Sequence, residues 1–165
     1  MKIKLFCLII WCIASIFTAN AQEKNGILNV GVGILPGIGG SISYDHKVKN
    51  LGEYSAFSVG GYVGYSRREG YTLAGGGSDV VFWDSKSLLA PRITCQYFSE
   101  QQKFEIFGAF MPGISIDRTY REHTKFGFFA GITAGFRIKL FKNLSVFAEA
   151  GYNVLCINSG LSFRY

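Results

Sequence analysis

Apolar residues recur at every second position over most of the chain, which is the period of a β-strand. The clearest stretch runs from Phe126 to Leu140, where eight apolar side chains alternate with a row rich in Gly that also holds Thr, Arg and Lys. Helical spacing is hard to find, and the 21 glycines of the chain would weaken helices further. The pattern predicts an all-β protein with a single domain.

The alternation divides the chain into eight expected strands, each with one apolar face and one small or polar face. Eight antiparallel neighbours joined in order by short turns are enough to close a small barrel. We therefore expect an eight-stranded antiparallel up-and-down β-barrel. The expected strands cover residues 28–34, 41–45, 54–67, 80–98, 103–116, 126–140, 144–153 and 158–165.

The composition of the polar face indicates which face points inward. In a soluble sandwich or lipocalin-like barrel the apolar face forms the core and the polar face meets water. In a membrane barrel the two faces are exchanged. Here the polar face is dominated by Gly, Ser and Thr, only 17% of the residues are charged, and such small side chains fit a narrow eight-stranded interior. The sequence therefore favours a transmembrane β-barrel.

Aromatic residues gather near the strand ends, as expected at the two water interfaces of a membrane. One predicted rim contains Tyr44, Tyr54, Tyr97, Phe98, Phe104, Phe141 and Tyr165, and the other contains Tyr65, Phe82, Trp83, Tyr120 and Tyr152.

A targeting segment precedes the expected strands. Lys2 and Lys4 form a basic start, residues 5–17 form an apolar run shorter than the roughly 20 residues of a spanning helix, and the small residues of "ANA" at 19–21 form a cleavage site. We expect residues 1–21 to be a signal peptide, cleaved between Ala21 and Gln22, and residues 22–165 to form the barrel domain.

Charge and cysteine content narrow the partners. Cleavage would remove Lys2 and Lys4 and lower the formal net charge from +6 to +4. This mildly basic balance favours anionic lipid headgroups, and the lack of a run of Lys and Arg argues against nucleic acid as a partner. Cys95 and Cys156 would be the remaining cysteines, which are too few for a disulfide framework.

The most specific motif lies in the last eight residues, NSGLSFRY. It consists of a polar residue, a glycine two positions later, and aromatic residues at the third-last and last positions, and these places are filled by Asn158, Gly160, Phe163 and Tyr165. In this motif and in its strand pattern the chain resembles the small eight-stranded outer-membrane barrels of the OmpX, Ail and OmpA type. The resemblance implies that the barrel-assembly machinery reads this segment.

The resemblance also implies a monomer in the outer membrane of a Gram-negative bacterium, surrounded by outer-membrane lipids and lipopolysaccharide. Both termini would be periplasmic, with short periplasmic turns near residues 50, 100 and 143 and longer outer connections at 67–79 and 117–124. We expect a structural or surface-interaction role, in adhesion or envelope integrity, with no catalysis and no cofactor.

Several charged residues fall on the face that is expected to point into the lumen. Isolated buried charges are costly, so these residues should pair into a network that closes the lumen to most solutes. A narrow channel for small solutes is the alternative interpretation. The predicted interior network consists of Arg92, Glu105, Arg137, Lys139, Glu149 and Arg164.

The third to sixth expected strands look longer than the roughly 9 to 11 residues that cross a bilayer. In the proteins that the chain resembles, such strands protrude from the membrane. We hypothesise that basic residues near this protrusion contact lipopolysaccharide phosphates or a host surface, whereas ordinary solvated charges are the alternative. The residues of this possible outer contact are Arg67, Arg68, Arg118, Arg121 and Lys125.

Two further alternatives belong to other classes of protein. A lipid-modifying barrel enzyme would need a His with a Ser or Asp partner for acyl transfer. His46 lies near a periplasmic turn, and His123 lacks a Ser two positions later, although Ser78 or Asp79 could approach it across the loops. A soluble lipocalin-like binder is the other alternative. The spacing of His and Cys predicts no metal site.

Overall fold

The computed structural model describes residues 25–34, 37–74, 78–101, 103–119, 124–153 and 155–165, with the backbone alone described for residues 70–74 and 78–82. The predicted signal peptide lies outside these residues. The strands are β1 (Gly26–Ile34), β2 (Ile38–Gly52), β3 (Ser55–Ala74), β4 (Ser78–Phe98), β5 (Phe104–Arg118), β6 (Thr124–Lys139), β7 (Leu144–Tyr152) and β8 (Ile157–Arg164). No helix among the described residues is long and apolar enough to cross a membrane.

Each strand pairs antiparallel with the next, and β8 returns to pair with β1. At this closing seam Ile27 lies opposite Arg164 and Ile34 lies opposite Ile157. Gly26 and Tyr165 exchange two backbone hydrogen bonds of 3.0 Å. The predicted eight-stranded antiparallel up-and-down barrel is therefore confirmed, and closure leaves no unpaired sheet edge to be satisfied by water.

Apolar side chains cover the outside of the barrel and polar side chains fill the inside. Phe128 is 99% exposed and Val32 is 69% exposed, whereas Asp45 and Thr94 are 0% exposed. This distribution is the reverse of that in a soluble protein and confirms the predicted direction of the two faces.

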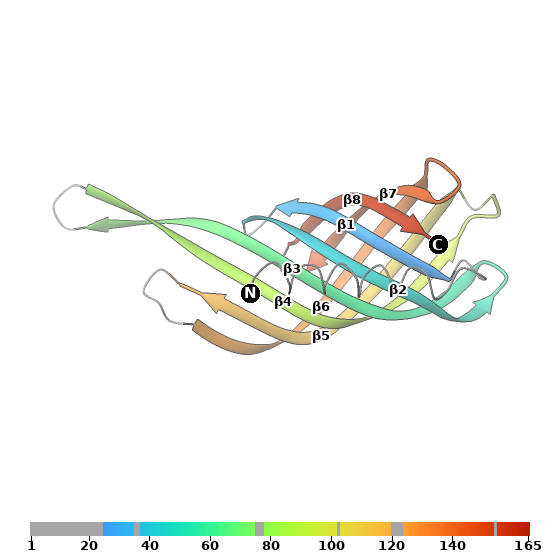
Figure 1. Ribbon diagram of the computed structural model, residues 1–165, viewed down its shortest axis with the longest axis horizontal. Helices are drawn as coiled ribbons and strands as arrows, with labels where there is room; N and C mark the ends of the chain where they lie inside the picture. Colours follow the sequence, from blue (N-terminus) through green and yellow to red (C-terminus); the bar gives the residue numbers. More distant parts are fainter. Residues whose placement is uncertain (1–24, 35–36, 75–77, 102, 120–123, 154) are drawn as a thin grey trace, which may run out of the picture.

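The barrel has an inner end, where β1 begins and β8 ends, and an outer end, which carries the β3–β4 and β5–β6 connections. The β3–β4 hairpin extends far beyond the other strands at the outer end (Figure 1). The outer connection predicted at residues 67–79 is therefore shorter than expected, because pairing continues from Arg67 opposite Ser85 to Ala74 opposite Ser78. The other predicted outer connection is confirmed, since β5 ends at Arg118 and β6 begins at Thr124.

The aromatic residues only partly follow the prediction. Tyr97 and Phe141 at the inner end, and Tyr65 and Tyr152 at the outer end, are exposed on the outside. Phe98 instead points into the inner mouth, because it lies opposite the inward-facing Glu105. Its prediction as a lipid-facing rim residue was wrong by one position in the alternation. The side chains of Phe82 and Tyr120 lie outside the described residues.

The β4–β5 ladder has a gap in the middle of the wall. Paired positions are described up to Leu89 opposite Ile114 and again from Ile93 opposite Phe110. Pro91 and Pro112 lie within the gap, and proline has no N–H group to donate to a ladder. The gap thus follows from the position of the two prolines.

Candidate functional site

Asp45, on β2, is the centre of a buried polar network in the inner half of the barrel. Its Oδ1 accepts a hydrogen bond of 2.9 Å from Thr94 and lies 3.3 Å from Nε of Arg92. Its Oδ2 accepts hydrogen bonds of 3.3 Å from Nδ2 of Asn29 and from Nη2 of Arg137. The carboxylate therefore joins side chains from four strands across the lumen.

Arg137, on β6, extends the network towards the inner mouth. Its Nη1 donates to Oε1 of Glu105, and its Nε donates to Oδ1 of Asn29 over 3.3 Å. The guanidinium carbon lies 4.1 Å from the centre of the Phe107 ring. The other carboxylate oxygen of Glu105 accepts a 2.7 Å hydrogen bond from Arg164. Each carboxylate oxygen of Glu105 thus accepts a hydrogen bond from a different arginine.

Arg92, on β4, extends the network towards the outer half. Its Nη2 donates to Oε2 of Glu149 over 3.0 Å, and Oε1 of Glu149 accepts a 2.9 Å hydrogen bond from Asn158. Asn158 also donates to Ser41 over 2.7 Å. These contacts connect β4, β7, β8 and β2, and leave both oxygens of Glu149 hydrogen-bonded.

The network contains three arginines and three carboxylates, so its formal charges cancel. Buried charges are tolerated in proteins when they are paired and hydrogen-bonded in this way. The structure brings together five of the six residues predicted for the interior, and it adds Asp45, Asn29 and Thr94, which were not among them. Asp45 occupies an inward position in the alternation and could have been found by that signal. The five residues are Arg92, Glu105, Arg137, Glu149 and Arg164.

Lys139 is the exception, and its prediction as a member of the interior network was wrong. It has the same inward parity as Arg137 but lies at the end of β6, where the barrel opens to water. It is exposed and forms no ion pair with any residue that the structure describes. Because the ammonium group of a lysine at the barrel mouth stays hydrated, it does not need a carboxylate partner to offset a cost of burial.

Two glycines at the closing seam make space for the network. A side chain at Gly31 would lie 2.6 Å from Oδ1 of Asn158 and 2.8 Å from the ring of Phe147. A side chain at Gly160 would overlap the carbonyl oxygen of Val30 and approach Cα of Gly31. Asn158 and Phe147 therefore occupy space that a side chain at Gly31 would take, whereas Gly160 allows the backbones of β8 and β1 to approach each other.

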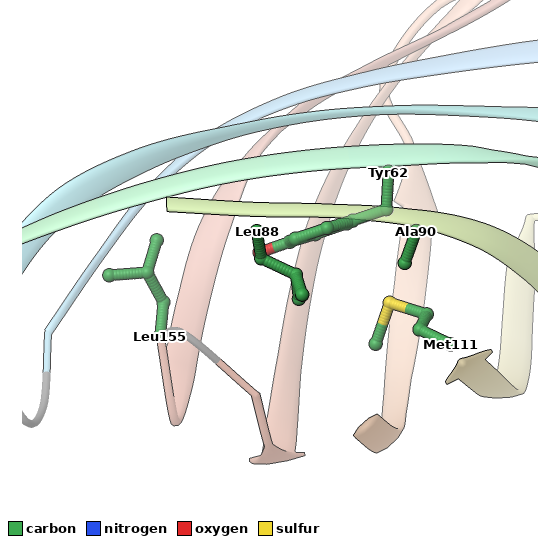
Figure 2. Close-up of a cluster of buried hydrophobic side chains, with 5 residues drawn as sticks. All are labelled: Tyr62, Leu88, Ala90, Met111 and Leu155. Atoms are coloured by element: carbon green, nitrogen blue, oxygen red, sulfur yellow. The ribbon is translucent and has the colours of Figure 1, made fainter. Parts of the chain in front are cut away.

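A layer of apolar side chains fills the lumen on the outer side of the charges. Tyr62, Leu88, Ala90, Met111 and Leu155 form a buried cluster (Figure 2), and Phe129 packs against it. Figure 2 shows that these side chains converge from several strands and from the chain between β7 and β8. Side chains consequently fill the lumen at two levels, as an ion-paired layer and as an apolar layer.

The structure divides the predicted outer contact between two faces. Arg67 and Arg118 occupy outward positions of the alternation, in register with the same residue, Ser85. The guanidinium carbon of Arg67 lies 3.9 Å from the centre of the Trp83 ring. Arg68 lines a hollow of about 260 Å³ at the outer mouth, together with Asp84, Lys86 and Asp117, and Arg118 also borders this hollow. Lys125, on β6, lies opposite Asp117, on β5. Arg121 falls outside the described residues.

The four residues of the predicted assembly motif have distinct positions on β8. Asn158 is buried in the network and Gly160 is in close contact with β1. Phe163 faces outward, and the Tyr165 ring stacks on Tyr44 with 6.2 Å between ring centres. Asn158, Gly160 and Tyr165 thus make specific structural contacts, in addition to any role in recognition.

Catalytic chemistry finds little support in the described residues. His46 lies at the inner end, where its Nδ1 is 3.2 Å from the hydroxyl of Tyr44. His123 and the side chains of Ser78 and Asp79 lie outside the part of the chain whose side chains are described. No group of three His, Cys, Asp or Glu residues that could hold a metal ion is found within the described residues.

Comparison with known proteins finds similarity among solved structures. No protein-family model and no curated protein matches the chain. The chain is similar to the crystal structure of Ail, the attachment invasion locus protein of Yersinia pestis, in complex with the heparin analogue sucrose octasulfate. The identity is 12%, the TM-score is 0.48, and the match covers 86% of this chain and 99% of that chain. The strand pairing of the protein itself identifies the fold as a closed, eight-stranded antiparallel barrel.

Proposed function

We propose that the protein is an integral barrel of the outer membrane of a Gram-negative bacterium, with a structural or surface-interaction role and no catalytic activity. The observation that carries this proposal is the apolar outer surface of a closed barrel whose buried charged side chains form ion pairs inside. Large exposed side chains such as Val63, Leu89 and Ile132 surround the wall. A continuous apolar surface of this extent would drive aggregation in water but matches the hydrocarbon of a bilayer.

The side chains that fill the lumen support a structural role over transport. Arg92 and Arg137 cross the lumen to carboxylates on other strands, and Tyr62 and Met111 fill the space beyond them. A solute would have to break several buried ion pairs to pass. Side chains commonly fill barrels of eight strands, which is consistent with a closed structure.

Membrane fractionation and gel migration test this function. The protein expressed with its N-terminal segment should be found in the outer-membrane fraction, should require detergent for extraction, and should migrate differently on a gel before and after boiling. Protein that stays soluble without detergent would support the lipocalin-like binder instead. Protein that enters the membrane but shows no heat-dependent migration would contradict a stable barrel.

For the surface-interaction role, we propose that Arg67 and Arg118 contact phosphate groups of lipopolysaccharide. Both lie just beyond the apolar band, because Tyr65 and Ile116 occupy the outward positions two residues earlier towards the membrane centre. Two strand spacings separate the backbones of Arg67 and Arg118, about 10 Å, with Ser85 between them. Guanidinium groups form bidentate hydrogen bonds with phosphate, so such a pair suits a lipid headgroup.

Adjacent arginines on opposite faces provide a matched control. Trp83 would be the only tryptophan of the cleaved protein, because Trp11 lies in the predicted signal peptide. Titrating purified lipopolysaccharide into the folded barrel in nonionic detergent should change the emission of Trp83. Arg118→Gln and Arg67→Gln should weaken the titration, whereas Arg68→Gln, which removes the same charge from the inward face, should not. Equal weakening by all three variants would indicate a general charge effect and contradict the proposed contact.

A further inference from the structure

The inner mouth of the barrel holds a second group of cations that the buried network does not use. Lys103 precedes β5, Lys139 ends β6, and Lys142 lies in the turn that follows. The three residues line one shallow cavity of about 20 Å³ together with Arg164, Glu105 and Phe98. The backbone N–H of Lys139 donates to the carbonyl of Lys103 over 2.9 Å, which places two of these lysines side by side. We call these three lysines the inner-mouth cluster.

The charge of the inner-mouth cluster is not balanced by the single carboxylate of the cavity. Both oxygens of Glu105 are already engaged, one by Arg137 and the other by Arg164. Among the described residues, no carboxylate lies within 4 Å of the ammonium groups of the three lysines. The inner mouth therefore presents three cations to solvent, next to a buried network whose own charges cancel.

The orientation of the lysines and the size of the cavity limit which ligands can bind there. Lys103 and Lys139 have the inward parity of Glu105 and Arg137, whereas their neighbours Phe104 and Ile138 face outward and are exposed. Lys103 and Lys139 therefore face the mouth of the lumen and not the surrounding lipid, and Lys142 lines the same cavity. The cavity has room for one small group, such as a carboxylate, and does not enclose a whole small molecule.

A single exposed lysine and carboxylate attract each other weakly in water. Affinity at such a site must come from several contacts made at once by one ligand. We propose that the inner-mouth cluster binds the repeated carboxylates of acidic cell-wall peptides on the periplasmic side of the membrane. This inference rests on the orientation in the proposed function, in which the inner end is periplasmic. It would attach the barrel to the polymer beneath the membrane.

Co-sedimentation with purified cell-wall sacculi tests the inference on the folded full-length barrel in nonionic detergent at low ionic strength. Wild-type protein should sediment with the sacculi, and Lys139→Gln/Lys142→Gln should bind about five- to tenfold more weakly. Lys47→Gln/Lys49→Gln is the matched control, because it removes the same charge at the same end from residues that do not line the cavity. This control should bind as the wild type does.

Blocking the carboxylates of the sacculi by amidation should abolish binding. Failure of the wild type to sediment, equal loss in both double variants, or retained binding to amidated sacculi would overturn the inference. Only protein whose heat-dependent gel migration shows that it is folded is used for sedimentation. Loss of binding to sacculi is therefore distinct from failure of the proposed membrane barrel. Binding of the wild type that is competed by inorganic phosphate but not by added acidic peptide would also overturn it, in favour of a phosphate site.

Discussion

Arg92 and Glu149 meet across the lumen from β4 and β7, with 3.0 Å between Nη2 and Oε2 and almost no exposure of either side chain. These strands are not neighbours in the barrel wall. The pair therefore links opposite parts of the wall, and its contribution to stability depends on both partners being present.

Glu149→Leu should strongly destabilise the barrel. It leaves Arg92 with Asp45 as its remaining ion-pair partner and removes an acceptor from Asn158. Removing one partner of a buried pair costs about 3 to 5 kcal/mol. Urea unfolding of the refolded protein, followed by Trp83 emission, measures the change. Glu100→Gln, in the exposed β4–β5 turn, should change stability by less than about 0.5 kcal/mol.

A double variant separates the cost of an unpaired charge from the loss of the side chain. Arg92→Met/Glu149→Leu removes one positive and one negative charge, and so the interior stays neutral. The double variant should lose less stability than the sum of the two single variants, because it removes both charges of the pair, whereas each single variant leaves one of them without its partner. An additive result would contradict direct coupling between the two residues.

Gly160→Ala should destabilise the closing seam. The added methyl group would overlap the carbonyl oxygen of Val30, and the β1–β8 ladder would have to shift. Overpacking of this kind costs about 1 to 3 kcal/mol. Gly61→Ala is the matched control, because a side chain at Gly61 meets no atom within 4 Å. Similar urea midpoints for the two variants would show that the seam adapts without cost.

The sequence predicted the strands and their faces because alternation depends only on neighbouring residues along one strand. The same rule placed Arg137 and Glu149 inside, where the structure finds them. It did not predict Asp45 as the centre of the network, because the depth at which four strands present side chains depends on their register around the barrel. It also placed Lys139 inside, since parity does not reveal where a strand leaves the barrel.

The outer hairpin could not be predicted from alternation alone. Residues 67–79 are rich in Gly and charged residues, which are typical of a loop. Pairing of β3 with β4 nevertheless continues to Ala74 and Ser78, because each strand satisfies the backbone hydrogen bonds of the other. Such pairing is a property of two segments together, and a pattern within either one does not reveal it.

Planar-bilayer recordings should show no steady conductance for the wild-type barrel. The apolar cluster and the ion-paired network each close the lumen, so removing one layer should not open it. Met111→Ala, which thins the apolar cluster, should therefore also stay closed. Steady single-channel steps from the wild type would contradict the closed lumen and support the narrow channel.

The assembly motif is tested by comparing two outward-facing aromatic residues. Phe163→Ser and deletion of Tyr165 should lower the amount of heat-modifiable barrel in the membrane, if the assembly machinery reads the C-terminal segment. Phe128→Ser removes a side chain that is more exposed to the surroundings but lies outside the motif. Equal losses for Phe128→Ser and Phe163→Ser would indicate lost lipid contact rather than lost recognition.

The stacked pair of Tyr165 and Tyr44 should make stability depend on alkaline pH. Burial, together with the neighbouring hydroxyl of Tyr44, raises the pKa of Tyr165 from 10.0 to about 12. The folded state therefore favours the neutral phenol. This contribution is fully present below pH 10, where the phenol is neutral in both states, and is lost as the pH rises from about 10 to about 12.

The wild type should lose stability over this range more steeply than Tyr165→Phe, which has no phenol to ionise. Urea midpoints measured at intervals from pH 9 to about 12 would show this difference, and Tyr97→Phe, an exposed tyrosine at the same end, should retain the wild-type slope. Parallel slopes for the wild type and Tyr165→Phe would contradict a coupled, partly desolvated phenol at the end of β8.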